Sequence, residues 1–213
     1  MRKFDKKQRN THKRNPKPVI AIVTEGENVT ETQYFNSFNT QHSGCIIKIV
    51  RAGGKTDPEK LLAQLDNYWK SNDLDSTLGD KGFVVLDLDC DYNKAAIIRN
   101  LKNSTDYDFI VSNPCFEVWF ILHFIYSTHV FSGSNEVLKT LEKYISGYSK
   151  TKNVFSQLED KMENAIANSD RIAEYFDSLQ MQWPSEECNP RTDVGMLVEL
   201  ILQKSNRDKL KNE

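Results

Sequence analysis

The sequence of 213 residues contains no apolar run close to the roughly 20 residues that a membrane-spanning helix needs. The basic beginning of the chain is not followed by an apolar segment, so a secretory signal is not expected. With 38% hydrophobic and 27% charged residues, the composition is that of an ordinary water-soluble domain. At this length, one domain with a helical appendage can bury a core without disulfides or structural metals.

Cysteine is scarce, and its distribution argues against a zinc or redox motif. No two cysteines have the CxxC spacing; the four are Cys45, Cys90, Cys115 and Cys188. We therefore expect reduced thiols in a cytoplasmic protein and no cysteine-ligated metal. A phosphate-binding loop is also missing. Residues 51–56 read RAGGKT, but the motif GxxxxGK needs a glycine where Ile49 stands.

The net charge of −2 conceals a strong asymmetry. Residues 1–17 hold eight lysines and arginines against one aspartate, a charge of +7, which leaves −9 on the rest of the chain. A basic arm suits contact with nucleic-acid phosphates, because counterion release drives such binding without a fold. The alternative is a disordered solubilising tail, which is common at chain termini.

Residues 82–91, GFVVLDLDCD, are the stretch around which the chain is organised. A continuous apolar run, typical of a strand buried on both faces, leads into Asp87, Asp89 and Asp91. Alternate positions point to one face, so these carboxylates can share a side if the strand continues. Such crowded carboxylates repel one another, and a divalent ion that prefers oxygen ligands, Mg²⁺ or Mn²⁺, relieves the repulsion. The alternative is a strand that ends in a solvated, aspartate-rich turn.

A second apolar run, within PVIAIVTEGENVTE (18–31), also ends in acids: Glu25, Glu27 and Glu31. Two such strands predict one parallel sheet with an acidic edge, and open α/β sheets bind ligands beyond the carboxyl ends of their strands. Glu25 is predicted to bind a metal or to act as a general base on water. Glu31 could join a second metal site, since two ions about 4 Å apart can clamp a phosphodiester. Alternatively, Glu27 and Glu31 form a solvated acidic helix start.

Strand and helix patterns alternate four times in the first half of the chain. This predicts an α/β fold with a mostly parallel sheet of about four strands flanked by helices. The expected strands are 19–24, 45–50, the run from residue 82, and 107–111. Past residue 131 only helices are expected, at 135–145, 154–180 and 192–205, with no strand. We divide the chain into a basic arm (1–17), an α/β core (18–130), a helical extension packed on it (131–205) and a charged tail (206–213).

Three further residues are candidates for chemistry. Glu117 lies in the apolar segment PCFEVWFILHF (114–124), a predicted buried helix, where a carboxylate must be paired, coordinated or protonated. The alternative is a structural ion pair. His123 in the same segment is more readily a core histidine than a ligand. Lys150, in YSKT, could offset charge on a reacting phosphate, or could be an ordinary surface lysine.

Several segments, in this order, resemble the RloB-like family, whose core is a TOPRIM-type fold. They are VTEGENVTETQYF (23–35), GGKTDPEKL (53–61), VVLDLDCD (84–91), SNPCFEVWFILHF (112–124), YSKT (148–151) and NPRTDVGMLVELI (189–201). The resemblance runs from about residue 18 to 203. The block at 112–124 is specific, whereas the EG and DxD elements are shared by all TOPRIM domains.

The resemblance implies a bacterial phage-defence protein of the abortive-infection kind, working beside an ABC-type ATPase. It also implies a nuclease similar to those of the OLD group, in which the first-strand glutamate and the DxD pair bind Mg²⁺; these match Glu25, Asp87 and Asp89. Glu117 and Lys150 fall within family blocks. TOPRIM domains also occur in topoisomerases and primases, but no catalytic-tyrosine neighbourhood or polymerase module is recognisable, which favours hydrolysis.

We therefore expect a Mg²⁺- or Mn²⁺-dependent endonuclease that acts on DNA or RNA. The expected catalytic residues are Glu25, Asp87, Asp89, Glu117 and Lys150, and the expected metal ligands are Glu25, Asp87, Asp89, Asp91 and Glu31. One alternative is a non-catalytic nucleic-acid sensor or adaptor for the ATPase. Another is a magnesium-dependent phosphoryl-transfer enzyme that acts on nucleotides. An oligomer is compatible with the sequence, and no membrane partner is expected.

Overall fold

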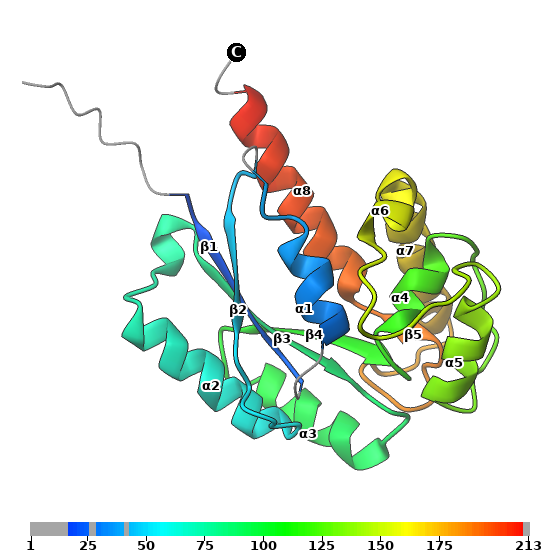
Figure 1. Ribbon diagram of the computed structural model, residues 1–213. Coiled ribbons are helices and arrows are strands. Elements are labelled where there is room, and N and C mark those ends of the chain that lie inside the picture. The colour runs from blue at the N-terminus through cyan, green and yellow to red at the C-terminus, as the bar shows by residue number, and fades with distance from the viewer. Residues whose placement is uncertain (1–16, 26–28, 41–42, 211–213) are drawn as a thin grey trace, which may run out of the picture.

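The computed structural model describes residues 17–25, 29–40 and 43–210 (Figure 1). Glu27 and nearly all of the basic arm lie outside these ranges, so the expectations about them stay predictions. Within the described ranges, no helix combines the length and the hydrophobicity needed to cross a bilayer.

A single five-stranded sheet forms the centre of the protein, in the order β2-β1-β3-β4-β5. Four strands run parallel: β1 (Val19–Thr24), β2 (Ile46–Val50), β3 (Lys81–Asp87) and β4 (Asp108–Asn113). The fifth, β5 (Arg191–Thr192), pairs antiparallel with β4. The mostly parallel sheet confirms the predicted fold class. The expectation of no strand after residue 131 is wrong, because two residues are too few to carry an alternating pattern.

Helices surround the sheet on both faces. Those between the parallel strands are α1 (Val29–Asn36), α2 (Pro58–Ser71) and α3 (Tyr92–Lys102). Those that follow β4 are α4 (Glu117–Leu122), α5 (Ser134–Leu141), α6 (Phe155–Leu158), α7 (Met162–Ser178) and α8 (Val194–Leu210). Short 3₁₀ turns occur at η1 (Ser76–Leu78) and η2 (Glu159–Lys161). The helix expected over 154–180 is therefore three consecutive segments, α6, η2 and α7.

The start of α2 illustrates how local sequence sets an element. Asp57 is its N-cap, and the Asp57 side chain accepts hydrogen bonds from the backbone N–H groups of Glu59 and Lys60. Pro58 fits the first helical position because its missing N–H would have no partner there. The sequence pair Asp57-Pro58 predicts a helix start as cap and first-turn proline, and the structure confirms it. The helix buries Leu61 and Leu65.

Strands β1, β3 and β4 are buried on both faces because helices form a layer on each side (Figure 1). In β1, Ala21 and Val23 pack on the side of α2 and α3, whereas Ile20 and Ile22 pack on the side of α1 and the later helices. This explains why β1 reads as an unbroken apolar run instead of an alternating one.

The later helices share one hydrophobic core with α1. The indole Nε1 of Trp119 in α4 donates to the Tyr34 hydroxyl at 2.7 Å, and that hydroxyl contacts Sδ of Met162 in α7 at 3.3 Å. Three elements far apart in the sequence are therefore tied together inside the protein.

The strand order reverses its direction at one position. From β1 the chain moves to β2 on one side, and then crosses back to β3 on the other side of β1. The carboxyl ends of β1 and β3 thus flank a topological switch point, where open α/β sheets bind their ligands.

Candidate metal centre

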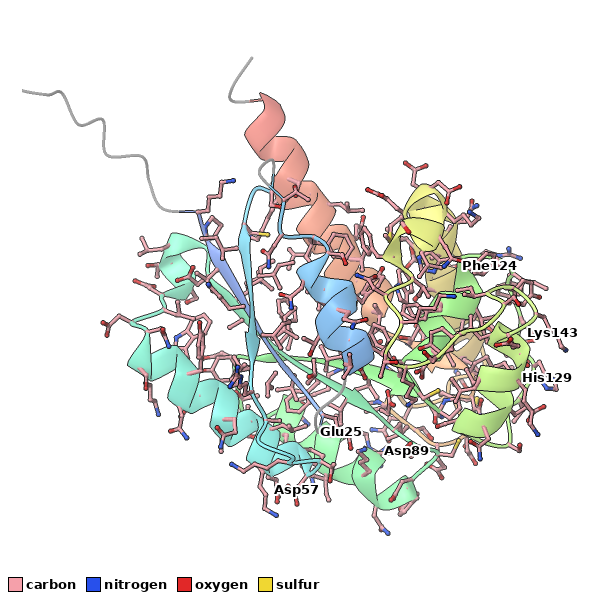
Figure 2. The ribbon with its side chains drawn as sticks, in the orientation of Figure 1. Glu25, Asp57, Asp89, Phe124, His129 and Lys143 are labelled. Atoms are coloured by element: carbon pink, nitrogen blue, oxygen red, sulfur yellow. The ribbon has the colours of Figure 1, made fainter. Side chains whose placement is uncertain are left out.

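Glu25 directly follows β1 and reaches the end of β3. Its Oε2 accepts a hydrogen bond from the backbone N–H of Asp87 at 3.2 Å. Parallel pairing sets Thr24 beside Val85, which brings the residue after β1 level with the last residues of β3. Figure 2 shows Glu25 and Asp89 at the same edge of the sheet. The two acidic segments therefore meet at the switch point.

Asp89 reaches this edge by way of a turn. The strand ends at Asp87, and Asp89 and Cys90 both have positive φ angles, 57° each. The expected alternation of side chains along a continuing strand therefore does not apply. Two bonds hold the turn: the Asp89 N–H donates to the Pro114 carbonyl at 2.9 Å, and the Cys90 N–H donates to Asn113 Oδ1 at 3.0 Å. The last residue of β4 and the proline after it thus position the second aspartate.

A lysine joins the two acidic segments. Lys94 Nζ lies 3.0 and 3.2 Å from the two carboxylate oxygens of Glu25, and 3.3 Å from Oδ2 of Asp89. Lys94 occupies the first turn of α3, where Asp91 is the N-cap and accepts from the Lys94 backbone N–H at 3.0 Å. Asp91 is exposed, and its proposed role as a metal ligand stays a prediction.

Glu31 and Glu117, from the first turns of α1 and α4, add two buried carboxyls that interact with Asp87. Burial, together with the charge of Glu117, raises the pKa of Glu31 from its ordinary 4.5 to about 7. Burial, followed by the charges of Glu31 and Glu117, raises the pKa of Asp87 well above its usual range. Glu31 and Asp87 therefore bind protons more readily than ordinary carboxylates do.

Glu117 has one satisfied oxygen and one unsatisfied oxygen. Its Oε1 accepts from the Tyr148 hydroxyl at 3.1 Å and lies 3.6 Å from Lys150 Nζ. Its Oε2 is buried and has no hydrogen-bond partner among the described residues. The pair with Lys150 fits the alternative that Glu117 forms a structural ion pair. The Oε2 atom without a hydrogen-bond partner fits coordination of a cation.

The segment that carries Lys150 is held by α1. The Lys150 carbonyl accepts from Thr30 Oγ1 at 2.9 Å, and the Thr151 carbonyl accepts from Gln33 Nε2 at 3.2 Å. Burial lowers the pKa of Lys150, but the charges of Glu117 and Asp87 outweigh it and raise the pKa above the ordinary value. The half-exposed ammonium is therefore a stable cation beside the acids.

The fit of a divalent cation can be tested on this arrangement. Among the described residues, no three carboxylate, histidine or cysteine side chains surround one cation position as they stand. However, the Lys94 ammonium occupies the position that a metal ion could take among three oxygens of Glu25 and Asp89. The unpartnered Glu117 oxygen is a further free donor. The donor set is all oxygen, which suits Mg²⁺ or Mn²⁺.

A family model that describes RloB-like proteins matches residues 20–201. The chain belongs to the RloB-like family. This confirms the resemblance drawn from the sequence blocks, and the match includes both acidic segments and both lysines described above. No curated protein and no solved structure matched the chain.

His123 of this RloB-like protein lies away from the acidic edge. Its Nδ1 is 2.9 Å from the Trp119 carbonyl, and its charged neighbours are Lys161 and Asp160. Burial lowers the pKa of His123 to about 4, so the ring is neutral at physiological pH. These contacts fit the core histidine that the sequence favours.

Two residues that organise the RloB-like site were missed by the sequence reasoning. Lys94 carries no motif, although its spacing of three from the cap residue Asp91 indicates a place in the first turn of a helix. From the sequence, Asn113 before Pro114 predicts only the end of the strand at 107–111. Its burial is the signal, because a fully buried amide must find several partners.

Proposed function

We propose that this RloB-like protein is a Mg²⁺- or Mn²⁺-dependent nuclease that hydrolyses phosphodiester bonds of nucleic acid. The supporting observation is the convergence of carboxyl groups from four elements at the switch point, next to two lysines. The carboxyl groups are Glu25, Glu31, Asp87, Asp89 and Glu117, and the lysines are Lys94 and Lys150. Metal-dependent phosphodiester hydrolysis uses this combination of anionic metal ligands and cations that face phosphate.

Five of these groups have a direct role in the proposed reaction. Glu25, Asp87 and Asp89 would hold the cation, which when bound supplies charge stabilisation and a more acidic water. Glu31, with a pKa of about 7, can take up a proton near neutral pH, which is what a general base requires. Lys150, half exposed beside Glu117, is available to a substrate phosphate.

The biological setting is proposed from the family resemblance. We infer a role in anti-phage defence of the abortive-infection kind, with an ABC-type ATPase as partner. The basic arm, residues 1–17, would add sequence-independent contacts to nucleic-acid phosphates, and these contacts weaken as salt increases.

The test is incubation of the full chain with DNA, transfer RNA and other RNA in Mg²⁺, in Mn²⁺ or in EDTA. Asp87→Asn, Asp89→Asn and Glu25→Gln should each lower cleavage by about 100-fold or more, because each removes a proposed ligand or base. Glu163→Gln, on an exposed carboxylate of α7, is the matched control and should cut normally. Full cleavage by Asp87→Asn, or cleavage in EDTA, would contradict the proposal.

Two other results would favour the alternatives. Nucleic-acid binding that survives Asp87→Asn but is lost when residues 1–17 are removed, with no cleavage by any form, would indicate a sensor or adaptor. Turnover of free nucleotides without nucleic-acid cleavage would indicate phosphoryl transfer on nucleotides.

A further inference from the structure

Lys94 differs from two other lysines of the described residues, Lys60 and Lys70, in its burial and its partners. Its side chain is only 13% exposed, and its ammonium bridges Glu25 after β1 and Asp89 after β3. By contrast, the side chains of Lys60 and Lys70 are 65% and 72% exposed, and each pairs with an aspartate on its own helix or cap. Exposed ion pairs of that kind contribute little to the stability of the folded protein. The Lys94 pair joins segments 69 residues apart.

The backbone also restricts Lys94. Its N–H is bonded to the Asp91 cap, which fixes the start of α3 against the turn that carries Asp89. The stem of Lys94 therefore leaves the helix at a defined point and leads directly to the acidic edge. Burial lowers the pKa of Lys94, but Glu25 and Asp89 outweigh that effect and raise the pKa, so the group is charged.

An ammonium and a divalent ion cannot use the same oxygens together. The ammonium lies 3.0–3.3 Å from its three oxygens, whereas Mg²⁺ requires oxygens at about 2.1 Å in a near-octahedral set. Two cations this close also repel each other, and the repulsion is stronger where water is excluded. Occupation by one therefore works against occupation by the other.

We propose that Lys94 is a built-in counter-ion for the metal position, and that a divalent cation binds by displacing its ammonium from Glu25 and Asp89. The inference rests on the proposed metal site. Lys94 thereby holds the acidic edge together when metal is absent and lowers its affinity for the cation. Once displaced, the ammonium stays tethered beside the ion, where it can contact a phosphate that binds the metal.

The test is Mn²⁺ titration of the full chain without nucleic acid, by calorimetry or by the electron paramagnetic resonance signal of free Mn²⁺. Lys94→Met removes the charge and keeps the apolar stem, and it should bind Mn²⁺ at least about tenfold more tightly than the unmodified chain. Lys70→Met, in an exposed pair, is the control and should leave the affinity unchanged. Equal or weaker Mn²⁺ binding by Lys94→Met overturns the proposal.

Thermal melting supplies a second readout, which also detects misfolding. In EDTA, Lys94→Met should melt below the unmodified chain, because Glu25 and Asp89 lose their counter-ion. In saturating Mn²⁺ the difference should vanish or reverse, because the ion replaces the ammonium. A deficit of the same size in both conditions would make Lys94 a purely structural ion-pair partner and would overturn the exchange.

A double variant tests whether the Mn²⁺ ion binds at Glu25. Glu25→Gln added to Lys94→Met should abolish the gain in Mn²⁺ affinity, since both changes act on one position. If the gain in Mn²⁺ affinity is undiminished, the cation binds elsewhere, and the proposed displacement of the Lys94 ammonium is rejected. No cleavage is measured in these experiments, so they do not depend on whether the protein is a nuclease. If Lys94→Met binds Mn²⁺ more tightly but the unmodified chain cuts no nucleic acid, the displacement of the ammonium is supported and the nuclease function is rejected.

Discussion

The side-chain carbonyl of Asn113 accepts a hydrogen bond from the backbone N–H of Cys90 at 3.0 Å. The same buried side chain donates through Nδ2 to the carbonyls of Glu186 and Cys188, at 3.0 Å each. One amide at the end of β4 therefore connects the turn that carries Asp89 to the segment before β5. This relationship explains why the second aspartate has a defined place after the strand has ended.

Asn113→Asp keeps an oxygen that accepts from the Cys90 N–H. It removes the Nδ2 group that donates to the Glu186 and Cys188 carbonyls, and it places a carboxylate oxygen against them. We expect unfolding free energy to fall by about 1–3 kcal/mol for each buried partner left unsatisfied. Denaturant unfolding of the full chain measures the loss. Asn113→Leu should cost at least as much and should also weaken Mn²⁺ binding, because the Asp89 turn loses its anchor. Native stability in both variants would contradict the positioning role.

The stability of the metal-free protein should depend on the ionisation of Glu31. Its pKa is about 7 in the folded protein against an ordinary 4.5, so the folded state binds more protons than the unfolded state between these values. The contribution of Glu31 to stability is therefore complete below about pH 4.5 and is lost as the pH rises to about 7. The raised pKa of Asp87 acts in the same direction.

Glu31→Gln should remove this part of the pH dependence. The unmodified chain in EDTA should lose at most about 3 kcal/mol more than the variant between pH 4.5 and pH 7. Denaturant unfolding at several pH values, with Glu163→Gln as the control, measures the difference. Parallel curves for the unmodified chain and Glu31→Gln would show that Glu31 titrates normally.

Lys150→Met should remove the cation beside Glu117 and keep the hydrogen bond from the Tyr148 hydroxyl. Breaking a fully buried ion pair costs about 3–5 kcal/mol, but the Lys150 side chain is 51% exposed, so we expect about 1 kcal/mol. Cleavage should fall by about 100-fold, since a cation facing the reacting phosphate is lost. Lys150→Arg should recover part of the activity.

The double variant Glu117→Gln with Lys150→Met separates stability from catalysis. It should regain the unfolding free energy lost in Lys150→Met, because no unpaired buried charge is left. It should still cut poorly. A double variant less stable than the sum of its two single changes would argue against a direct Glu117–Lys150 pairing.

His123 should affect stability at acid pH and not cleavage. Its pKa is about 4 in the folded protein against an ordinary 6.5, so the unfolded state binds more protons between these values. This contribution is complete above about pH 6.5 and is lost as the pH falls to about 4. The stability difference between the unmodified chain and His123→Leu should change by about 3 kcal/mol over that interval. A large loss of cleavage in His123→Leu at pH 8, with the fold intact, would assign the ring to the site instead.

Much of the architecture could be predicted from local patterns. The runs in β1 and β3 are apolar because both faces are covered, and Asp57 with Pro58 marks a helix start that the structure confirms. β5 could not be predicted, because its two residues pair with β4 only after α7 has brought the chain back. The geometry of Asp89 was also out of reach, since positive φ angles replace the expected pleat.

What the sequence by itself determined is that acidic residues follow two buried strands and so gather at one edge of a parallel sheet, because those strands share a direction. Which charges then pair was decided only by the tertiary structure. Lys94 reaches Glu25 across 69 residues of sequence, and Glu117 approaches Asp87 from a helix beyond β4. Electrostatic interactions depend on distance in space and on burial, and a linear pattern encodes neither for residues on different elements.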